Sequence, residues 1–460
     1  MRADVLALVL AKRRALRGHE RWSRERIAAH QRARLADLMR HATLRSPYYR
    51  EVLGGRSSVP LAAIPPLTKA TLMSRFDEIS TEPLVRLADL ERFLAGGGDE
   101  ALFADRFWVA ATSGSSGRRS IIPATLSEWT ATIASYARAQ EWAGIRARLT
   151  GHARMAVVSS TSRSHQSALV GATVKSPFLV TERYDAGAPL QDTVAALNRF
   201  QPEILVAYAS MLRILADEQR AGRLSITPRA VNGSSEPLTA ETRAHVGAAW
   251  NVQCFDVYAA TESSGVAAEC SAHRGLHVFE DLVILEIVDD EYRAVPPGET
   301  GTRALVTVLS SRTLPLIRYE LTDRIRTLPA AEADAACACG RTFRRVAGIE
   351  GRTDDVLRMA RDDGQPVFVH PVVFHRVLEA AAVAGWQVRQ HGAQLELLVA
   401  RPESGVDTAK LGAEIAAAVA QTGAQRPTVN VVVVDAVPPG AAGKRPRVIA
   451  DKEKEAPRAA

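Results

Sequence analysis

Apolar and polar residues follow two different periods along the chain, and this pattern predicts most of its elements. Residues 1–53 are rich in Arg, Ala and Leu, and apolar positions such as Leu35, Leu38 and Met39 recur at helical spacing. Further along, short apolar runs alternate with longer amphipathic segments. We expect a helix that Ser127 caps and that ends near Trp142, strand 155–159, helix 190–200, strand 204–207, helix 210–221 and strand 252–257. Such alternation is typical of parallel β-α layers, in which ligands bind at the carboxyl ends of the strands.

The C-terminal part has the pattern of a smaller module. Residues 394–400 predict a strand, residues 407–423 a helix and residues 427–437 a second strand. A chain of 460 residues also exceeds one ordinary hydrophobic core. We therefore expect a large domain over residues 1–350 and a small domain over residues 351–460.

The composition is typical of a globular protein and indicates which classes of partner to expect. Hydrophobic residues make up 47%, charged residues 24% and aromatic residues 5%, with a formal net charge of +7. Acidic and basic residues are interleaved and no nucleic-acid-binding module is recognisable, so we expect small polyanions such as ATP or CoA as partners rather than nucleic acid. The apolar run 5–10 is short, and basic residues follow it instead of preceding it, which predicts a cytoplasmic protein with neither membrane span nor signal peptide. Nothing in the pattern indicates the oligomeric state.

A loop rich in glycine and hydroxyl groups, ATSGSSGRRS, lies between two apolar runs at residues 111–120. Its candidate phosphate-binding residues are Thr112, Ser113, Gly114, Ser115, Ser116 and Gly117. The glycines let the backbone approach a phosphate, and the hydroxyl and N–H groups donate to it. The short glycine spacing and the absence of a following lysine exclude the P-loop of kinases and GTPases. The alternative interpretation is a plain linker.

Two later segments carry chemistry that suits a nucleotide. In YAATESS the ring of Tyr258 can stack on a base, the hydroxyl of Thr261 can contact a phosphate and the carboxylate of Glu262 can bind magnesium. In IRYELTDRI the two oxygens of Asp323 suit two ribose hydroxyls. Asp323 could instead cap a turn. In the later segment GRTDDVL, Arg352 could likewise belong to a surface bend instead of the nucleotide site.

In this order the segments resemble the adenylate-forming superfamily, which includes acyl-CoA synthetases and peptide-synthetase adenylation domains. The segment HATLRSPYYREVL and the paired cysteines described below resemble the phenylacetate-CoA ligase family. The resemblance covers almost the whole chain. It implies an α/β fold whose large N-terminal domain of layered β-sheets and helices binds ATP and an acid, followed by a small mobile α+β C-terminal domain.

The resemblance also implies roles for single residues. Tyr258 would face adenine, Thr261 the α-phosphate and Glu262 the magnesium ion. The other implied site residues are Gly233, Ser234, Ser235 and Glu236 beside adenine, Asp323 on the ribose, Arg352, and Asp354 as the hinge. His165 would be a gate near the carboxylate substrate, unless it is an ordinary surface histidine. Lys444 in GKRPR would be the catalytic lysine, unless this turn is a solvated basic tail.

Four cysteines in so long a chain do not form a disulfide framework. ECSAHRGLH supplies Cys270, and CACG supplies Cys337 and Cys339. Three thiolates and one imidazole would complete a tetrahedral structural zinc site. The resemblance favours His277 as the fourth ligand, whereas His273 has the more familiar Cys-x2-His spacing; free thiols are the alternative.

Taken together, these motifs and the resemblance predict an AMP-forming ligase. The resemblance implies that a carboxylic acid, aryl or arylacetic, attacks ATP in the presence of Mg²⁺ to give an acyl-adenylate and pyrophosphate, and that CoA then accepts the acyl group. The segment DDVLRMARDDGQPVF departs from the glycine-rich turn usual in related CoA ligases, which leaves an amide synthetase with an amine acceptor as the alternative. A third hypothesis is that the protein is a relic that binds nucleotide without catalysis.

Overall fold

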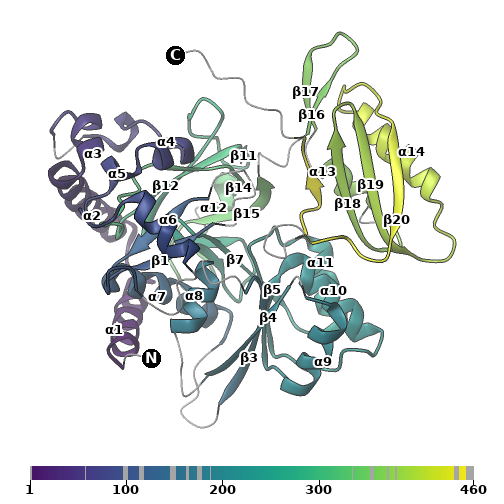
Figure 1. Ribbon diagram of the computed structural model, residues 1–460, viewed down its shortest axis with the longest axis horizontal. Helices are drawn as coiled ribbons and strands as arrows, with labels where there is room; N and C mark the ends of the chain where they lie inside the picture. Colours follow the sequence, from purple (N-terminus) through teal and green to yellow (C-terminus); the bar gives the residue numbers. More distant parts are fainter. Residues whose placement is uncertain are drawn as a thin grey trace. The chain divides into compact units, whose positions relative to one another are not determined.

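The computed structural model divides the chain into two compact units, Met1–Glu350 and Gly351–Ala460 (Figure 1). It describes residues 3–56, 59–96, 102–112, 119–145, 152–161, 165–173, 179–186, 188–333, 335–352, 357–369, 372–378, 381–439 and 445–451. Each unit has its own buried apolar core. Within the described residues, no helix has both the length and the apolarity needed to cross a membrane.

The first unit begins with helices, as the periodicity of residues 1–53 predicts. Their bounds are α1 Ala3–His19, α2 Arg24–Arg45, α3 Pro47–Val52, the 3-10 helix Leu61–Ala63, α4 Lys69–Ser74, α5 Phe76–Ile79 and α6 Leu87–Ala95. Ser46 separates α2 from α3: its hydroxyl accepts a hydrogen bond from the N–H of Tyr49, and Pro47 starts α3 where no N–H is needed. The helical prediction is confirmed.

A ten-stranded sheet forms the centre of this unit, with the strand order β11-β14-β15-β9-β8-β7-β6-β5-β3-β4. The strands are β3 Ala153–Ser159, β4 Leu179–Asp185, β5 Ile204–Tyr208, β6 Ala230–Ser234, β7 Cys254–Ala260, β8 Ser264–Glu269, β9 Leu276–Val278, β11 Thr300–Gly301, β14 Asp323–Thr327 and β15 Arg345–Arg352. The connecting helices are α8 Gln166–Thr173, α9 Leu190–Phe200, α10 Ala209–Arg220 and α11 Ala240–Trp250. Strands β3 to β7 pair in parallel, so the predicted β-α layers are confirmed.

Two smaller sheets complete the unit. Strands β1 (Trp108–Ala111) and β2 (Ile121–Ala124) form an antiparallel hairpin. Strands β10 (Val283–Val288), β12 (Arg303–Val308) and β13 (Tyr319–Leu321) form the other sheet, and the short helix α12 is Ala330–Ala333. One continuous cluster of buried side chains joins the N-terminal helices, the hairpin, β7 to β9 and this second sheet. The candidate nucleotide motifs therefore lie on a single packed core.

One predicted helix start is wrong. Helix α7 spans Leu126–Trp142, and its N-cap is Thr125 rather than Ser127. The carboxylate of Glu128 accepts a hydrogen bond from the N–H of Thr125 at 2.8 Å, which is half of a capping box. The Thr-x-x-Glu spacing thus satisfies the helix terminus two residues earlier than the serine would.

The second unit is built on a four-stranded sheet with the order β20-β19-β18-β21. Its elements are β16 Leu357–Ala360, β17 Pro366–Val369, α13 Val372–Leu378, β18 Val383–His391, β19 Gln394–Pro402, α14 Thr408–Ala420, β20 Val429–Val434 and β21 Val448–Ile449. Strands β19 and β20 pair in parallel across α14, as the predicted β-α-β unit requires. Trp386 on β18 is fully buried, and this strand was missing from the sequence prediction.

Candidate active site

The hairpin β1–β2 holds both ends of the predicted phosphate loop. Its strand ends are joined by a hydrogen bond from the Thr112 N–H to the Ser120 carbonyl at 3.0 Å, and the Thr112 hydroxyl accepts from the Ser120 N–H at 2.9 Å. Ser113, Gly114, Ser115, Ser116 and Gly117 lie outside the described residues. The described part of this motif is therefore an anchored base, and its contact with phosphate stays a prediction.

Tyr258 and Asp323 bring two distant motifs together. Tyr258 lies in β7 and Asp323 is the first residue of β14, in the same ten-stranded sheet. The Tyr258 hydroxyl donates a hydrogen bond to Asp323 Oδ2 at 2.8 Å, and both residues are buried. A ring expected on adenine and a carboxylate expected on ribose are thus neighbours, as binding of one nucleoside requires.

Glu262 lies two residues after the end of β7, the strand that holds Tyr258, and it contacts Tyr319. The Tyr319 hydroxyl donates to Glu262 Oε1 at 3.0 Å, and Tyr319 is 1% exposed. Burial and then the negative charge of Glu262 raise the pKa of Tyr319, so its hydroxyl stays protonated and remains a donor. Sequence reasoning missed Tyr319, although it stands four residues before Asp323 in the motif already selected. The signal that could have found it is a tyrosine in the same short motif as Asp323.

Gln166 links the loop that carries His165 to the Tyr258–Glu262 loop. Gln166 Nε2 donates to the Thr261 carbonyl at 2.9 Å, and Gln166 Oε1 accepts from the Tyr136 hydroxyl at 2.7 Å. His165 precedes α8, whose first turn bonds to the His165 carbonyl. The gate candidate therefore lies one residue from a direct contact with the nucleotide motif, and its role as a gate stays a prediction.

The segment expected beside adenine ends β6 and turns sharply. Gly233 and Ser234 are the last residues of β6, and Ser235 has a left-handed φ of 63°. A Cβ on Gly233 would lie 3.2 Å from the side chain of Leu238, so the strand end is closely packed. Glu236 Oε2 accepts from the N–H of Ser210 at 2.8 Å, at the start of α10. Glu236 thus has a structural contact of its own, and its predicted contact with adenine remains an expectation.

A small cavity lies against Glu262. It is lined by β1, β2, α7 and the residues that open β8, including Thr132, Gln166 and Ser264. Its volume is about 50 Å³.

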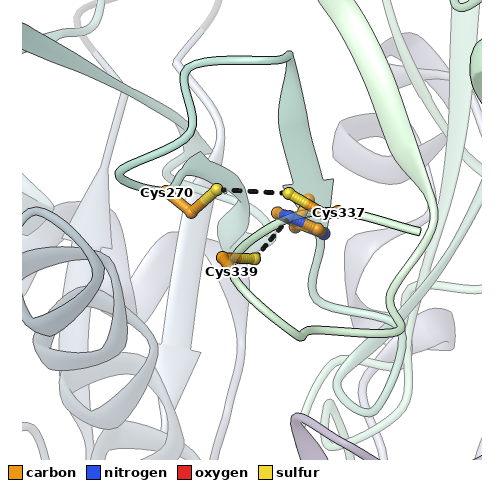
Figure 2. A group of neighbouring side chains, drawn as sticks. Cys270, Cys337 and Cys339 are labelled. Carbon is orange, nitrogen blue, oxygen red and sulfur yellow. Dashed lines mark hydrogen bonds between the residues drawn. The ribbon is translucent and has the colours of Figure 1, made fainter. Parts of the chain in front are cut away.

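Three cysteines and one histidine converge at the other end of β8 (Figure 2). The potential ligand atoms of Cys270, His277, Cys337 and Cys339 all lie within 4.8 Å of one another. Cys270 follows β8 and His277 lies in β9, joined by a turn at Gly275 with φ 86°. A Cβ on Gly275 would lie 2.3 Å from the Val346 carbonyl, so only glycine fits this turn.

The separations within this cluster suit a tetrahedral metal. Ligands at the usual zinc distances place two sulfurs about 3.8 Å apart and a sulfur and a nitrogen about 3.6 Å apart. Cys270 and Cys337 have their sulfurs 3.7 Å apart, and Cys339 Sγ lies 3.4 Å from His277 Nε2 (Figure 2). The hydrogen bond between Cys270 and Cys339 lowers the pKa of the Cys339 thiol and raises that of the Cys270 thiol.

The structure separates the two candidate histidines. His277 is fully buried, and its Nδ1 lies 3.0 Å from the Phe343 carbonyl, which can only accept; Nδ1 therefore carries the proton and Nε2 faces the thiols. His273 instead pairs its Nδ1 with Glu269 at 3.5 Å and lies against the ring of Phe255. Of the two, only His277 belongs to the cluster.

The remaining predicted site residues belong to the domain junction and the second unit. Asp354 and Lys444 lie outside the described residues, and Arg352 is described only as the last backbone position of β15. Directly after Lys444 the chain is anchored: Arg445 Nε donates to the Val437 carbonyl at 3.1 Å, and the Pro446 carbonyl accepts from Gln387. The roles of Arg352, Asp354 and Lys444 stay predictions.

Comparison with known proteins finds CoA ligases that are similar in sequence and in fold. No family model matches the chain. It is 28% identical to phenylacetate-coenzyme A ligase of Thermus thermophilus over 405 residues, which cover 85% of this chain and 82% of the relative. For the same-named ligase of Aromatoleum evansii the identity is 27%, with coverage of 74% and 73%.

Solved structures share the fold. A 2-hydroxyisobutyryl-CoA ligase in complex with 2-HIB-AMP has a TM-score of 0.70 at 22% identity, covering 93% of this chain and 90% of that one. Anthranilate CoA ligase AuaEII in complex with anthranoyl-AMP has a TM-score of 0.50 at 18% identity, covering 73% and 65%. The protein therefore shares the fold of adenylate-forming ligases, and its sequence is similar to those of the phenylacetate-CoA ligases.

Proposed function

We propose that the chain activates a carboxylic acid with ATP and transfers the acyl group to CoA. A carboxylate oxygen attacks the α-phosphorus, the bond from that phosphorus to pyrophosphate breaks, and an acyl-adenylate forms. The thiolate of CoA then attacks the acyl carbon and AMP leaves. Adenylation turns a poor leaving group into a good one, so the protein contributes mainly positioning and charge stabilisation.

The observation that carries this proposal is the hydrogen bond between Tyr258 and Asp323. It joins a motif expected on adenine to a motif expected on ribose, with Thr261 and Glu262 following in the same loop. The Tyr258 ring would stack on the base, and Asp323 would accept from the ribose hydroxyls. The Thr261 hydroxyl would then donate to the α-phosphate.

Glu262 fits the requirements of a magnesium ligand. Its carboxylate is partly buried, and one of its oxygens is held by Tyr319. Carboxylate oxygen is a preferred ligand of Mg²⁺, and the ion, when bound with ATP, offsets charge on the phosphates. The residues present therefore suit Mg-ATP.

The acid that the relatives' names favour is arylacetic, and we carry an aryl or arylacetic acid to this chain as the proposed substrate class. The loop of His165, which Gln166 ties to Thr261, is the position that we propose for the gate of the acid site.

The second unit, Gly351–Ala460, is proposed as the mobile domain. Asp354 would be its hinge and Lys444 would bridge the acid carboxylate and the α-phosphate during adenylation. The anchoring of Arg445 and Pro446 to the unit's own sheet supports this reading over a free basic tail.

Cys270, His277, Cys337 and Cys339 are proposed to bind one structural zinc ion. Their separations suit tetrahedral coordination, and four protein ligands leave no position for a substrate. Holding β8, β9 and the Cys337–Cys339 segment together would stabilise the strand that begins just after Glu262.

Product analysis tests this function. Purified protein is incubated with ATP, Mg²⁺, CoA and a panel of aryl, arylacetic and short aliphatic acids, and acyl-CoA and AMP are measured by mass spectrometry. The proposal predicts equal amounts of both products with at least one acid. A matched reaction with amine acceptors in place of CoA separates the thioester reaction from the amide synthetase, and AMP release with neither product would contradict the proposed acceptor.

A further inference from the structure

The carboxylate of Glu262 is held by Tyr319, a residue of a different sheet. Within the described part of the chain, the hydrogen bond from the Tyr319 hydroxyl to Oε1, at 3.0 Å, is the one bond that this carboxylate accepts from the protein. Glu262 stands between β7 and β8 of the large sheet, whereas Tyr319 stands in β13 of the three-stranded sheet. The contact therefore bridges two sheets at the candidate metal ligand.

The backbone around Tyr319 is held in a costly conformation. Arg318, the preceding residue, has φ 52°, in the left-handed region that an arginine rarely adopts. Its N–H donates to the Thr307 hydroxyl at 3.0 Å, its Nε to Glu286 at 3.1 Å and its Nη1 to the Ile64 carbonyl at 2.5 Å. These contacts compensate the unfavourable φ of Arg318. They also hold the backbone at the start of β13, where Tyr319 lies.

The backbone around Glu262 is constrained in the same way. Ser264 has φ 62°, and its hydroxyl lies 2.8 Å from the hydroxyl of Thr132 on α7. Gly265 follows, and its N–H donates to the Ser135 hydroxyl at 3.1 Å. Both partners of the Tyr319–Glu262 contact are thus anchored through their own neighbours, so the bond is a product of backbone placement and not of two mobile side chains meeting.

We infer that Tyr319 is a positioning residue for Glu262: its hydroxyl holds Oε1 and leaves Oε2 for the magnesium ion of Mg-ATP. The inference rests on the proposed function, because it needs Glu262 to be the metal ligand. Removing a residue that orients a metal ligand lowers metal affinity by about 10-fold to 100-fold. Tyr319 has the properties of such a partner, since it is buried and the backbone before it is held by the contacts of Arg318.

Tyr319→Phe removes one oxygen atom, and the chain offers a matched control. Tyr49 is also 1% exposed; its hydroxyl donates to the Pro315 carbonyl at 2.8 Å and accepts from the Ile317 N–H. Tyr49→Phe therefore removes the same atom from the same neighbourhood without touching Glu262. Binding of ATP is measured by calorimetry at a series of Mg²⁺ concentrations, together with the melting temperature of each variant.

The inference predicts that Tyr319→Phe raises the half-saturating Mg²⁺ concentration for ATP binding by about 10-fold to 100-fold, while Tyr49→Phe leaves it unchanged even if its melting temperature falls. In a Glu262→Gln background, Tyr319→Phe should add no further change, because the two residues act through one contact. An unchanged Mg²⁺ requirement in Tyr319→Phe, or a change equal to that of Tyr49→Phe, overturns the inference.

Two further outcomes are informative. If Glu262→Gln itself leaves the Mg²⁺ requirement unchanged, the proposed role of Glu262 fails, and this is distinguishable from failure of the Tyr319 inference alone. If Tyr319→Phe does not fold, the double variant Tyr319→Phe/Glu262→Gln, which no longer leaves a carboxylate without its donor, should fold and bind ATP like Glu262→Gln. A double variant that also fails to fold would assign Tyr319 a structural role and overturn the inference.

Discussion

The hydroxyl of Tyr258 donates a hydrogen bond to Oδ2 of Asp323 at 2.8 Å, across 65 positions of sequence. In Tyr258→Phe the ring that would stack on adenine is kept, but Asp323 loses a hydrogen-bond donor to its carboxylate. A hydrogen bond to a charged group contributes roughly 1.5–3 kcal/mol, so we expect KM for ATP to rise by about 10-fold or more. Steady-state kinetics at saturating acid and CoA measure this, and an unchanged KM would show that the bond does not prepare the nucleotide site.

The cysteine cluster predicts a metal requirement for stability. Cys337→Ser should reduce zinc content from about one ion per chain and lower the melting temperature by roughly 5–10 °C. Cys254→Ser is the control, because Cys254 is an equally buried thiol that does not belong to the cluster. Elemental analysis and thermal denaturation of both variants decide the matter. Wild-type protein that is stable but zinc-free after metal-replete expression would contradict the assignment.

Asp256 predicts a pH-dependent contribution to stability. Burial, and then the charge of Glu269, raise the pKa of Asp256 from 3.8 to about 7. A carboxyl group whose pKa is higher in the folded state stabilises the fold fully below its unfolded pKa and loses that contribution as pH rises towards 7. Asp256→Asn cannot ionise, so its stability relative to wild type should be higher at pH 8 than at pH 5, by roughly 1–4 kcal/mol. Urea unfolding at both pH values tests this, and parallel pH profiles would refute it.

Lys444→Ala separates adenylation from acyl transfer. Losing one electrostatic contact in the transition state costs about 100-fold to 1,000-fold in rate, so we expect this variant to be deficient in acyl-adenylate formation. Supplied with chemically prepared acyl-adenylate and CoA, it should still form thioester at a near-normal rate. Adenylation within about threefold of wild type would instead favour a solvated basic tail at Lys444, since a side chain in water makes no such contact.

Local chemistry explains which parts of the site were predictable. Tyr258, Glu262 and Asp323 stand in short motifs that can be recognised without a structure. The base stacking, metal binding and ribose recognition that we propose for them would each need one side-chain type at a set position. Strands β3, β5 and β7 were predicted within a few residues because buried parallel strands are continuous apolar runs.

Other features depended on tertiary packing. Tyrosine is a common residue in strands, so Tyr319 carries no signal of its own. It reaches Glu262 because two separate sheets lie against each other in the fold. The resemblance favoured His277 as the fourth cluster ligand, whereas the Cys-x2-His spacing left His273 open. The β8–β9 turn decides between them, because it brings His277 to the thiols and His273 to Glu269. Helix α7 is capped by Thr125 together with Glu128, and not by Ser127 two residues later.

The central claim is acid-dependent adenylation, and pyrophosphate exchange tests it most directly. Labelled pyrophosphate is followed into ATP without CoA, with each acid of the panel, for wild type and Glu262→Gln. The account predicts exchange that requires both an acid and Mg²⁺ and that falls by about 100-fold or more in Glu262→Gln, because loss of a metal ligand removes charge stabilisation at the phosphates. Folded protein that binds Mg-ATP but catalyses no exchange with any acid, or exchange that Glu262→Gln retains in full, would contradict it.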